Sequence, residues 1–342
     1  MLLSICMPTL NRASFIGETL DSILPQLAED MEVVVVDGGS GDGTAEVVAR
    51  RAAVCPRIRY HRTAHSVPGT PKPSNEGYDR DCDGAVQLAR GRYCWLLPDD
   101  DLIVPTALAT LRASLEKGVA LVVVNAEVRS LDLSRQLVPK QMVLGGDVSF
   151  PKGDANRLLE VAGSYLSYAG GVVVRRDWWL ARDRDKYYGS GFVHVGTLFQ
   201  QPSDLDAIVI AEPLIRVRYG NALWSDRAFA IRMFHWPELI WSLPLEEEAK
   251  KAVIPREPWT QWARLVLYRA RGIYRRKEYR LIRERKVLSW PTRVVASGLT
   301  LVPGGLLNVL GQLLLLVLGR RQSLAFVDLR QSPNNLLGGG RP

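Results

Sequence analysis

The chain has 342 residues, of which 47% are hydrophobic and 23% charged, so wholesale disorder is excluded. The 29 glycines and 20 prolines are too few for a collagen-like or low-complexity architecture. Lys and Arg outnumber Asp and Glu by 44 to 36, which indicates an anionic partner: a nucleotide, a nucleic acid or a membrane surface. The four cysteines form no C-x-x-C pair, and the N-terminus lacks a secretory pattern. We therefore expect a cytoplasmic protein with reduced thiols.

The first 125 residues alternate between strand-like and helix-like patterns. Short apolar or β-branched runs predict strands, and apolar residues at helical spacing predict helices. In chain order we predict strand 2–7, helix 14–27, strand 31–36, helix 44–51, strand 58–61, helix 83–89, strand 93–97, helix 107–116 and strand 119–124. This order predicts an α/β fold with a mostly parallel sheet flanked by helices. Ligands are then expected beyond the carboxyl ends of the strands.

From residue 130 to residue 221 the pattern is more broken. Short apolar runs at 171–174 and 207–210 alternate with turn residues, and aromatic residues are frequent. This composition suits a region that covers the sheet on the side of a second substrate.

The composition changes after residue 256. Residues 256–293 hold 12 Lys or Arg against 3 Asp or Glu, with aromatic and aliphatic residues interleaved. An apolar stretch at 294–318 follows, and its uninterrupted part, 306–318, has 13 residues, fewer than the roughly 20 needed to span a bilayer. We predict a helical, amphipathic extension at 256–330 that contacts a membrane surface through residues 256–320. A helical cap on the core and a protein-binding surface remain open. We expect residues 333–342 to be disordered.

Polar residues follow two of the predicted strands. The first strand leads into Pro8, Thr9, Asn11 and Arg12, which offer a hydroxyl, an amide and a guanidinium group. The second ends in a glycine-rich turn that contains Asp37, Gly39 and Ser40. Taken singly, these segments could be a simple turn and a surface loop. Because the carboxyl ends of parallel strands share one edge, we expect the two segments to meet.

Three adjacent carboxylates, Asp99, Asp100 and Asp101, follow a third apolar strand. Their mutual repulsion favours a bound cation, and an all-oxygen site favours Mg²⁺ or Mn²⁺, which could in turn hold a diphosphate. The alternative is a helix N-terminus that complements the helix dipole.

Three segments together, residues 5–12, 33–44 and 88–101, resemble the family 2 glycosyltransferases. That family has the GT-A fold, a Rossmann-like sheet, and transfers sugar from a nucleotide-sugar. Residues 77–81, ahead of 93–96, are similar to the abequosyltransferase-type O-antigen enzymes. The resemblance covers about residues 2–125 well and extends thinly to residue 224. It implies a nucleotide-sugar-binding half at 1–125 and an acceptor-binding half at 126–245.

The resemblance also implies roles for single residues. Thr9 and Asp37 correspond to residues that contact the nucleobase. The family's Asp-x-Asp motif, which binds ribose and a metal, fits Asp99 and Asp101, or Asp100 if it is aligned one residue differently. Asp79 and Arg80 lie where the family has residues near the base or pyrophosphate, although a solvated loop is equally compatible.

The mechanism that the resemblance implies is a single displacement with inversion. Many family members take the base from a Glu-Asp motif, but the corresponding residues 192–196 hold no carboxylate. His194 is the candidate base, since an imidazole titrates near neutral pH. The alternatives are a core role for His194, with Asp204 or Asp206 as the base, or Asp185. Arg218, Asn221 and Trp224 either close over the diphosphate or acceptor, or simply pack.

These residues predict a metal-dependent inverting glycosyltransferase, peripheral on the inner face of the cell membrane. Its acceptor is expected to be a saccharide or a polyprenyl-linked saccharide, in O-antigen or related polysaccharide synthesis. A non-catalytic nucleotide-sugar binder is one alternative. A nucleotidyltransferase is disfavoured because no glycine follows the first strand. A nucleic-acid reader is disfavoured because residues 306–318 are too apolar.

Overall fold

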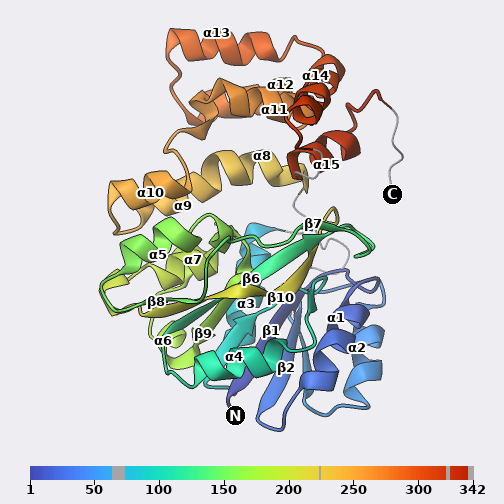
Figure 1. Ribbon diagram of the computed structural model, residues 1–342, viewed down its shortest axis with the longest axis vertical. Helices are drawn as coiled ribbons and strands as arrows, with labels where there is room; N and C mark the ends of the chain where they lie inside the picture. The colour runs from blue at the N-terminus through green and yellow to red at the C-terminus, as the bar shows by residue number, and fades with distance from the viewer. Residues whose placement is uncertain (64–73, 223–224, 321–323, 338–342) are drawn as a thin grey trace. The chain divides into compact units, whose positions relative to one another are not determined.

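The computed structural model describes residues 1–63, 74–222, 225–320 and 324–337. The chain divides into two compact units (Figure 1), which are described separately below. The first comprises Met1–Leu223 and Glu238–Ile254, and the second Trp224–Pro237 and Pro255–Pro342. The predicted nucleotide-sugar-binding half, residues 1–125, belongs to the first unit. The predicted acceptor-binding half, residues 126–245, is divided, because Trp224–Pro237 belongs to the second unit.

The first unit is built on one mixed sheet (Figure 1). Among the described residues its strands run in the order β3-β2-β1-β4-β9-β6-β10-β5, with β7 beside β6 and β8 beside β10. Their bounds are β1 Leu3–Thr9, β2 Met31–Asp37, β3 Ile58–Arg62, β4 Tyr93–Leu96, β5 Leu102–Ile103, β6 Leu121–Arg129, β7 Gln136–Val138, β8 Val148–Phe150, β9 Val172–Arg175 and β10 Ala207–Arg218. Strand β9 is antiparallel to both β4 and β6. Since β6 and β10 are parallel, β1–β4, β6 and β10 all point the same way.

Helices cover both faces of this sheet, which explains why β1 and β2 are buried along their whole length. Right-handed crossovers put α1 (Ile16–Ile23) and α2 (Thr44–Ala52) on one face and α3 (Asn75–Leu88) on the other. In agreement, α1 packs against α2, and α3 against β1 and β2. The remaining helices of this unit include α4 Ala107–Leu115, α5 Ala155–Ala162, α6 Arg176–Leu180, α7 Val193–Leu198 and α10 Glu247–Val253; α9 spans Trp236–Ser242.

Two predicted helices differ in extent from the observed ones. Helix α3 begins at Asn75, eight residues before the predicted start, and the Ser74 hydroxyl accepts a hydrogen bond from Gly77 N at 2.9 Å. Asp79 and Arg80 therefore lie on a helix and not in a loop. Helix α1 ends at Ile23, before a 3₁₀ turn at Leu24–Gln26 that contains Pro25.

The second unit is helical and has its own apolar core. Its helices are α8 Ala228–Ala230, α11 Trp262–Ala270, α12 Arg276–Arg285, α13 Trp290–Leu299, α14 Gly304–Val317 and α15 Leu324–Gln331, and Ile231–His235 forms a π-helical segment. The core gathers Phe229, Phe234, Trp259, Leu265, Tyr268, Tyr274 and Ile282, among others. The buried Asn308 amide donates to the carbonyls of Ala270 and Leu329, which ties α14 to α11 and α15.

Within the described residues, no single helix is both long and apolar enough to cross a membrane. Helices α13 and α14 are long and apolar enough only when they are taken together, and the pair is bent by 94°. Of the segment predicted to be disordered, residues 333–337 are described, and Asn334 donates to the Arg269 carbonyl at 2.9 Å. Residues 338–342 and Trp224 lie outside the described residues.

Candidate functional site

The three polar segments meet at one edge of the sheet. Thr9 at the end of β1 pairs in register with Asp37 at the end of β2. Strand β4 lies on the other side of β1, with Leu96 opposite Cys6, and Asp99 follows three residues later. The expected convergence at the carboxyl edge is therefore present.

The turn after β2 is built around the Asp37 carboxylate. Its Oδ1 accepts hydrogen bonds from Gly39 N at 2.9 Å and Ser40 N at 2.7 Å. The Tyr60 hydroxyl donates to Oδ2 at 2.6 Å. Gly39 has a φ of 102°, which a residue with a side chain rarely adopts. Burial, followed by the nearby Asp37 carboxylate, raises the pKa of Tyr60, so this phenol remains a proton donor.

The loop after β1 is tied to that turn. Asn11, at a φ of 54°, donates its backbone N–H to Ser40 Oγ at 2.8 Å, and its side-chain oxygen accepts from Gly41 N at 2.9 Å. Arg12 N donates to Thr44 Oγ1 at 2.9 Å. The two loops thus form one rigid frame, and Thr44 bonds to the first loop while it begins α2.

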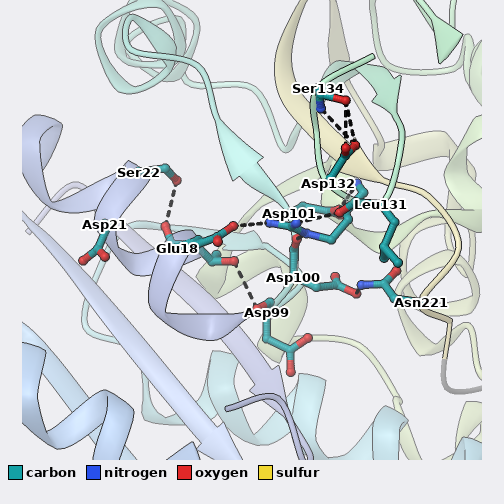
Figure 2. A network of polar contacts seen from close by, with 12 residues as sticks. Glu18, Asp21, Ser22, Asp99, Asp100, Asp101, Leu131, Asp132, Ser134 and Asn221 are labelled. Atoms are coloured by element: carbon teal, nitrogen blue, oxygen red, sulfur yellow. Dashed lines mark hydrogen bonds and ion pairs between the residues drawn. The ribbon is translucent and has the colours of Figure 1, made fainter. Parts of the chain in front are cut away.

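The Arg12 guanidinium group lies beside the aspartate run, Asp99–Asp101, and supplies positive charge to it. Its Nε lies 3.3 Å from Asp99 Oδ1 and its Nη2 lies 3.0 Å from Asp100 Oδ2. The Asn221 amide donates to Asp100 Oδ2 at 2.8 Å (Figure 2). The Asn221 backbone carbonyl accepts from Arg12 Nη1 at 3.1 Å. Part of the mutual repulsion that favoured a bound cation is therefore relieved by a guanidinium group.

Arg218, the last residue of β10, holds the third aspartate and its neighbours. Its backbone N–H donates to Asp101 Oδ1 at 2.8 Å, and the Tyr168 hydroxyl donates to Asp101 Oδ2 at 2.5 Å. The Arg218 guanidinium donates to the carbonyls of Asp100 at 3.0 Å and Leu131 at 2.7 Å. It also pairs with Glu18 on α1 (Figure 2). Arg218 thus fixes the aspartate run between β10 and α1.

The aspartate run is buried and incompletely neutralised. Burial, and then repulsion from Asp100, raises the pKa of Asp99 to about 7 despite the opposing effect of Arg12. Burial also raises the pKa of Asp100, and it raises that of Asp101 well above its ordinary value. The Thr9 hydroxyl, itself buried, has no hydrogen-bond partner of normal geometry among the described residues. The edge therefore favours a bound cation or a proton.

The three carboxylates do not converge on one point. Within the part of the chain that the structure describes, no group of three or more His, Cys, Asp or Glu side chains has the geometry to hold a metal ion. A metal at this edge would need ligands from outside the protein as well.

Asp79 and Arg80, two of the predicted site residues, lie on α3 in different surroundings. The buried Asp79 accepts from Gly191 N at 2.8 Å and Val193 N at 3.0 Å, at the start of α7. The exposed Arg80 pairs with Glu76 and lies over the Tyr188 ring. Asp79 thus fixes a loop, and Arg80 lies on the solvent side of α3.

Asp81 was not among the predicted site residues, and it lies beside the Asp37 turn. A Cβ added to Gly38 would be 2.6 Å from Asp81 Oδ2, and the Thr63 hydroxyl donates to Oδ1 at 3.3 Å. On a helix that starts at residue 75, Asp81 lies on the same face as the buried Cys82 and Ala85. The apolar spacing that identifies this face begins before residue 83, where the predicted helix started.

His194 is enclosed in α7. The side chain is 1% exposed, its Nε2 lies 2.9 Å from the Leu166 carbonyl, and its Nδ1 has no partner among the described residues. Burial lowers the pKa of His194 to about 4, so the imidazole is neutral at physiological pH.

The other candidate bases are Asp204, Asp206 and Asp185. Asp206, directly before β10, accepts from Ala120 N at 2.8 Å, and the exposed Asp204 precedes it in a short 3₁₀ turn. Both stand at the amino end of β10, opposite the edge that carries Asp37 and Asp99. Asp185 is exposed in another 3₁₀ turn.

Comparison with known proteins identifies the family to which the chain belongs. Residues 4–178, just over half of the chain, match the family described as glycosyl transferase family 2. The chain is a family 2 glycosyltransferase. Its GT-A fold is as predicted, and the predicted assignment as a glycosyltransferase is confirmed.

Two bacterial relatives are sugar transferases by name. The glycosyltransferase is 29% identical over 249 residues to the abequosyltransferase RfbV of Salmonella typhimurium, covering 68% of the chain and 71% of the relative. It is 29% identical over 148 residues to the GalNAc(5)-diNAcBac-PP-undecaprenol beta-1,3-glucosyltransferase of Campylobacter jejuni, covering 43% and 45%. Among solved structures, residues 1–349 of S. aureus TarS in complex with UDP share the fold, with a TM-score of 0.55 at 18% identity over 96% of this chain and 89% of that one.

The buried Asp81 gives a prediction on stability. Burial raises the pKa of Asp81 to about 7 from 3.8, so the folded protein binds this proton more tightly than the unfolded chain does. Its contribution to stability is therefore greatest at low pH and is lost as the pH rises through the folded pKa. Relative to wild type, Asp81→Asn should gain roughly 1–4 kcal/mol of unfolding free energy between about pH 4 and about pH 8, as measured by urea titration.

Asp183→Asn is the matched control, because the Asp183 side chain is exposed. Its stability curve should run parallel to wild type. If the Asp81→Asn curve also runs parallel, Asp81 does not carry the proton that its burial implies.

Proposed function

We propose that this glycosyltransferase is a metal-dependent inverting enzyme. It would transfer a sugar from a nucleotide-sugar to a hydroxyl of a saccharide carried on a polyprenyl diphosphate, in O-antigen or related polysaccharide assembly. The observation that carries the proposal is the meeting of the Asp37 turn with the buried, under-neutralised Asp99–Asp101 run at one edge of the sheet. The names of the two bacterial relatives support the choice of pathway and acceptor.

The donor would lie along this edge. The buried Thr9 hydroxyl, beside Asp99, and the Asp37 turn could offer hydrogen bonds to a nucleobase, and the buried Asp81 lies against that turn. Arg12, between Asp99 and Asp100, places a positive charge beside the expected position of the diphosphate. Gly39 and Ser40 have small side chains, so the backbone of the Asp37 turn could approach the donor closely.

The aspartate run fits a divalent cation that is shared with the donor. Mg²⁺ and similar ions are commonly held by one or two carboxylates together with substrate phosphates, so three converging side chains are not required. We assign the protein ligands to Asp99 and Asp101 on the Asp-x-Asp spacing. Asp99 also pairs with Arg12, and the Asp101 oxygens accept from Arg218 N and Tyr168, but a carboxylate oxygen keeps a further lone pair for a cation. When bound, Mg²⁺ or Mn²⁺ would neutralise charge on the departing nucleoside diphosphate.

In the reaction, the acceptor hydroxyl oxygen would bond to the anomeric carbon as the bond from that carbon to the diphosphate oxygen breaks. The hydroxyl proton would pass to a base. The chain's own contribution is orientation: Tyr168 and the Arg218 backbone hold Asp101, and Arg12 holds Asp99 and Asp100. These bonds hold the carboxylates that would orient the donor before attack.

We assign His194 a positioning role in place of the base. Its buried Nε2 bonds to the Leu166 carbonyl, and Leu166 lies two residues before Tyr168, which bonds to Asp101. An imidazole that is 1% exposed, with a pKa near 4, is poorly suited to meet an acceptor hydroxyl and remove its proton.

The second unit would bring the enzyme to the cytoplasmic face of the membrane. Residues 256–320 combine many Lys and Arg with exposed apolar side chains, such as Trp262 at 65% and Trp290 at 75% exposure. Interfacial helices have this combination, and it would place the active site near a lipid-linked acceptor.

The Asp101 carboxylate provides the test of metal-dependent transfer. Asp101→Asn keeps an oxygen that can accept from Arg218 N, and its amide NH₂ can donate to the Tyr168 hydroxyl oxygen. The charge is lost, so the fold should persist while transfer falls at least about a hundred-fold. The measurement is nucleoside diphosphate release from a panel of UDP-, CDP-, dTDP- and GDP-sugars with a lipid-linked saccharide extract, with and without EDTA. Asp21→Asn, which removes a carboxylate that is 58% exposed, is the control and should remain active. Near-normal turnover by Asp101→Asn, or turnover that survives EDTA, would contradict the proposal.

The two roles of His194 predict different results. The side-chain amide of the His194→Gln variant could still donate to the Leu166 carbonyl, whereas the methyl group of His194→Ala could not. With a positioning role, His194→Gln should stay within about tenfold of wild type, His194→Ala should lose more, and the pH–rate profile should keep its shape. With a base role, both variants should lose about 10²–10⁴ in turnover, and the limb of the profile that reports the base should disappear.

A further inference from the structure

A basic pocket lies between α12 and α13 in the second unit. It has a volume of about 610 Å³. Helix α12 lines it with Arg276, Arg280 and Arg283 against a single carboxylate, Glu284. The three arginines stand at spacings of four and three residues, which places them on one face of the helix. Like charges gathered on one face repel one another unless an anion joins them.

The three guanidinium groups have no anionic partner among the described residues. All three side chains are exposed, and none makes an ion pair or a hydrogen bond with another described residue. Arg283 lies over the Tyr279 ring, with its guanidinium carbon 6.0 Å from the ring centre. By contrast, the nearby Arg271 pairs with Asp328 at 2.9 Å and Arg269 donates to the Val302 carbonyl at 2.9 Å. The arginines of the pocket are thus available to an anion.

Leu301 at the other wall of the pocket continues an exposed apolar stripe that begins outside the pocket, on α13. Ser297, Gly298 and Leu301 line the pocket from the α13 side, and Leu301 is 68% exposed. Trp290 and Val294 precede them at helical spacing and are 75% and 49% exposed. The hydroxyls on this wall are already satisfied, since Ser297 donates to the Val294 carbonyl and Thr300 to the Ser297 carbonyl. The pocket therefore pairs cationic groups with an exposed apolar edge.

We propose that this pocket binds the phosphate of an anionic phospholipid, with the Trp290–Val294–Leu301 stripe in contact with the acyl region. The inference rests on the proposed association with a membrane surface and names the group that the surface would present. Arginine forks match phosphate oxygens, and a Trp beside an apolar stripe suits the boundary between head groups and acyl chains. A soluble phosphate compound would use the arginines but leave the stripe in water.

The experiment is co-sedimentation of the full chain with vesicles of phosphatidylcholine alone, phosphatidylcholine with phosphatidylglycerol, and phosphatidylcholine with undecaprenyl phosphate. Wild type should partition onto the phosphatidylglycerol vesicles. The Arg276→Gln/Arg280→Gln/Arg283→Gln variant should bind them about a hundred-fold more weakly, since each Lys or Arg near an anionic surface contributes about fivefold in affinity. Because these side chains bond to no other described residue, the urea midpoint of the variant should match wild type.

Two controls separate the pocket from general charge. Arg50→Gln/Lys117→Gln/Arg135→Gln removes the same charge from exposed positions of the first unit and should bind like wild type. Within α12, Lys277→Gln alters an exposed residue outside the pocket and should weaken binding less than Arg280→Gln.

The outcomes distinguish this proposal from the one on which it rests. If wild type binds phosphatidylglycerol vesicles and the triple pocket variant binds them equally well, the pocket is wrong while membrane association stands. Preference for undecaprenyl phosphate over phosphatidylglycerol would overturn the phospholipid in favour of the acceptor lipid. If wild type binds none of the vesicles, membrane association itself is wrong, and the pocket proposal falls with it.

Discussion

The site depends on the burial of three consecutive carboxylates at the carboxyl edge of the sheet. Removal of Asp99, Asp100 and Asp101 from water is costly unless positive charge or hydrogen bonds compensate. The chain supplies part of this compensation through Arg12, Asn221, Tyr168 and the Arg218 backbone. The raised pKa values of the three aspartates indicate that the compensation is incomplete. An edge with that deficit is suited to a cation that arrives with an anionic donor.

The same bonds connect distant parts of the first unit. Arg12 links the loop after β1 to the aspartate run and to Asn221, beyond β10. Arg218 links β10 to the same run and to Glu18 on α1. Movement of either arginine would therefore disturb the donor edge and the segment after β10 together. This arrangement gives a physical reason for a cationic residue directly after the first strand.

The sequence predicted the parallel strands β1–β4 and β6 and the donor edge because these depend on local patterns, whereas the short strands β5, β7 and β8 were not predicted. The β-branched run that ends at Asp37 is typical of a buried strand, and parallel strands bring their ends together. The partners of Arg218 could not be predicted, because they lie about a hundred residues or more away along the chain. Burial of His194 against Leu166 was likewise a tertiary contact. Asp81 was missed for a simpler reason, since the predicted third helix began too late.

The central claim is that the Asp37 turn and the aspartate run bind a nucleotide together with a divalent cation. The most direct measurement is calorimetric titration of the full chain with UDP, CDP, dTDP and GDP, each with Mn²⁺ and with EDTA. The account predicts that one nucleotide binds with a dissociation constant of roughly micromolar order, and that the heat disappears in EDTA. Binding of none of the four, or binding that is equally tight in EDTA, would contradict it.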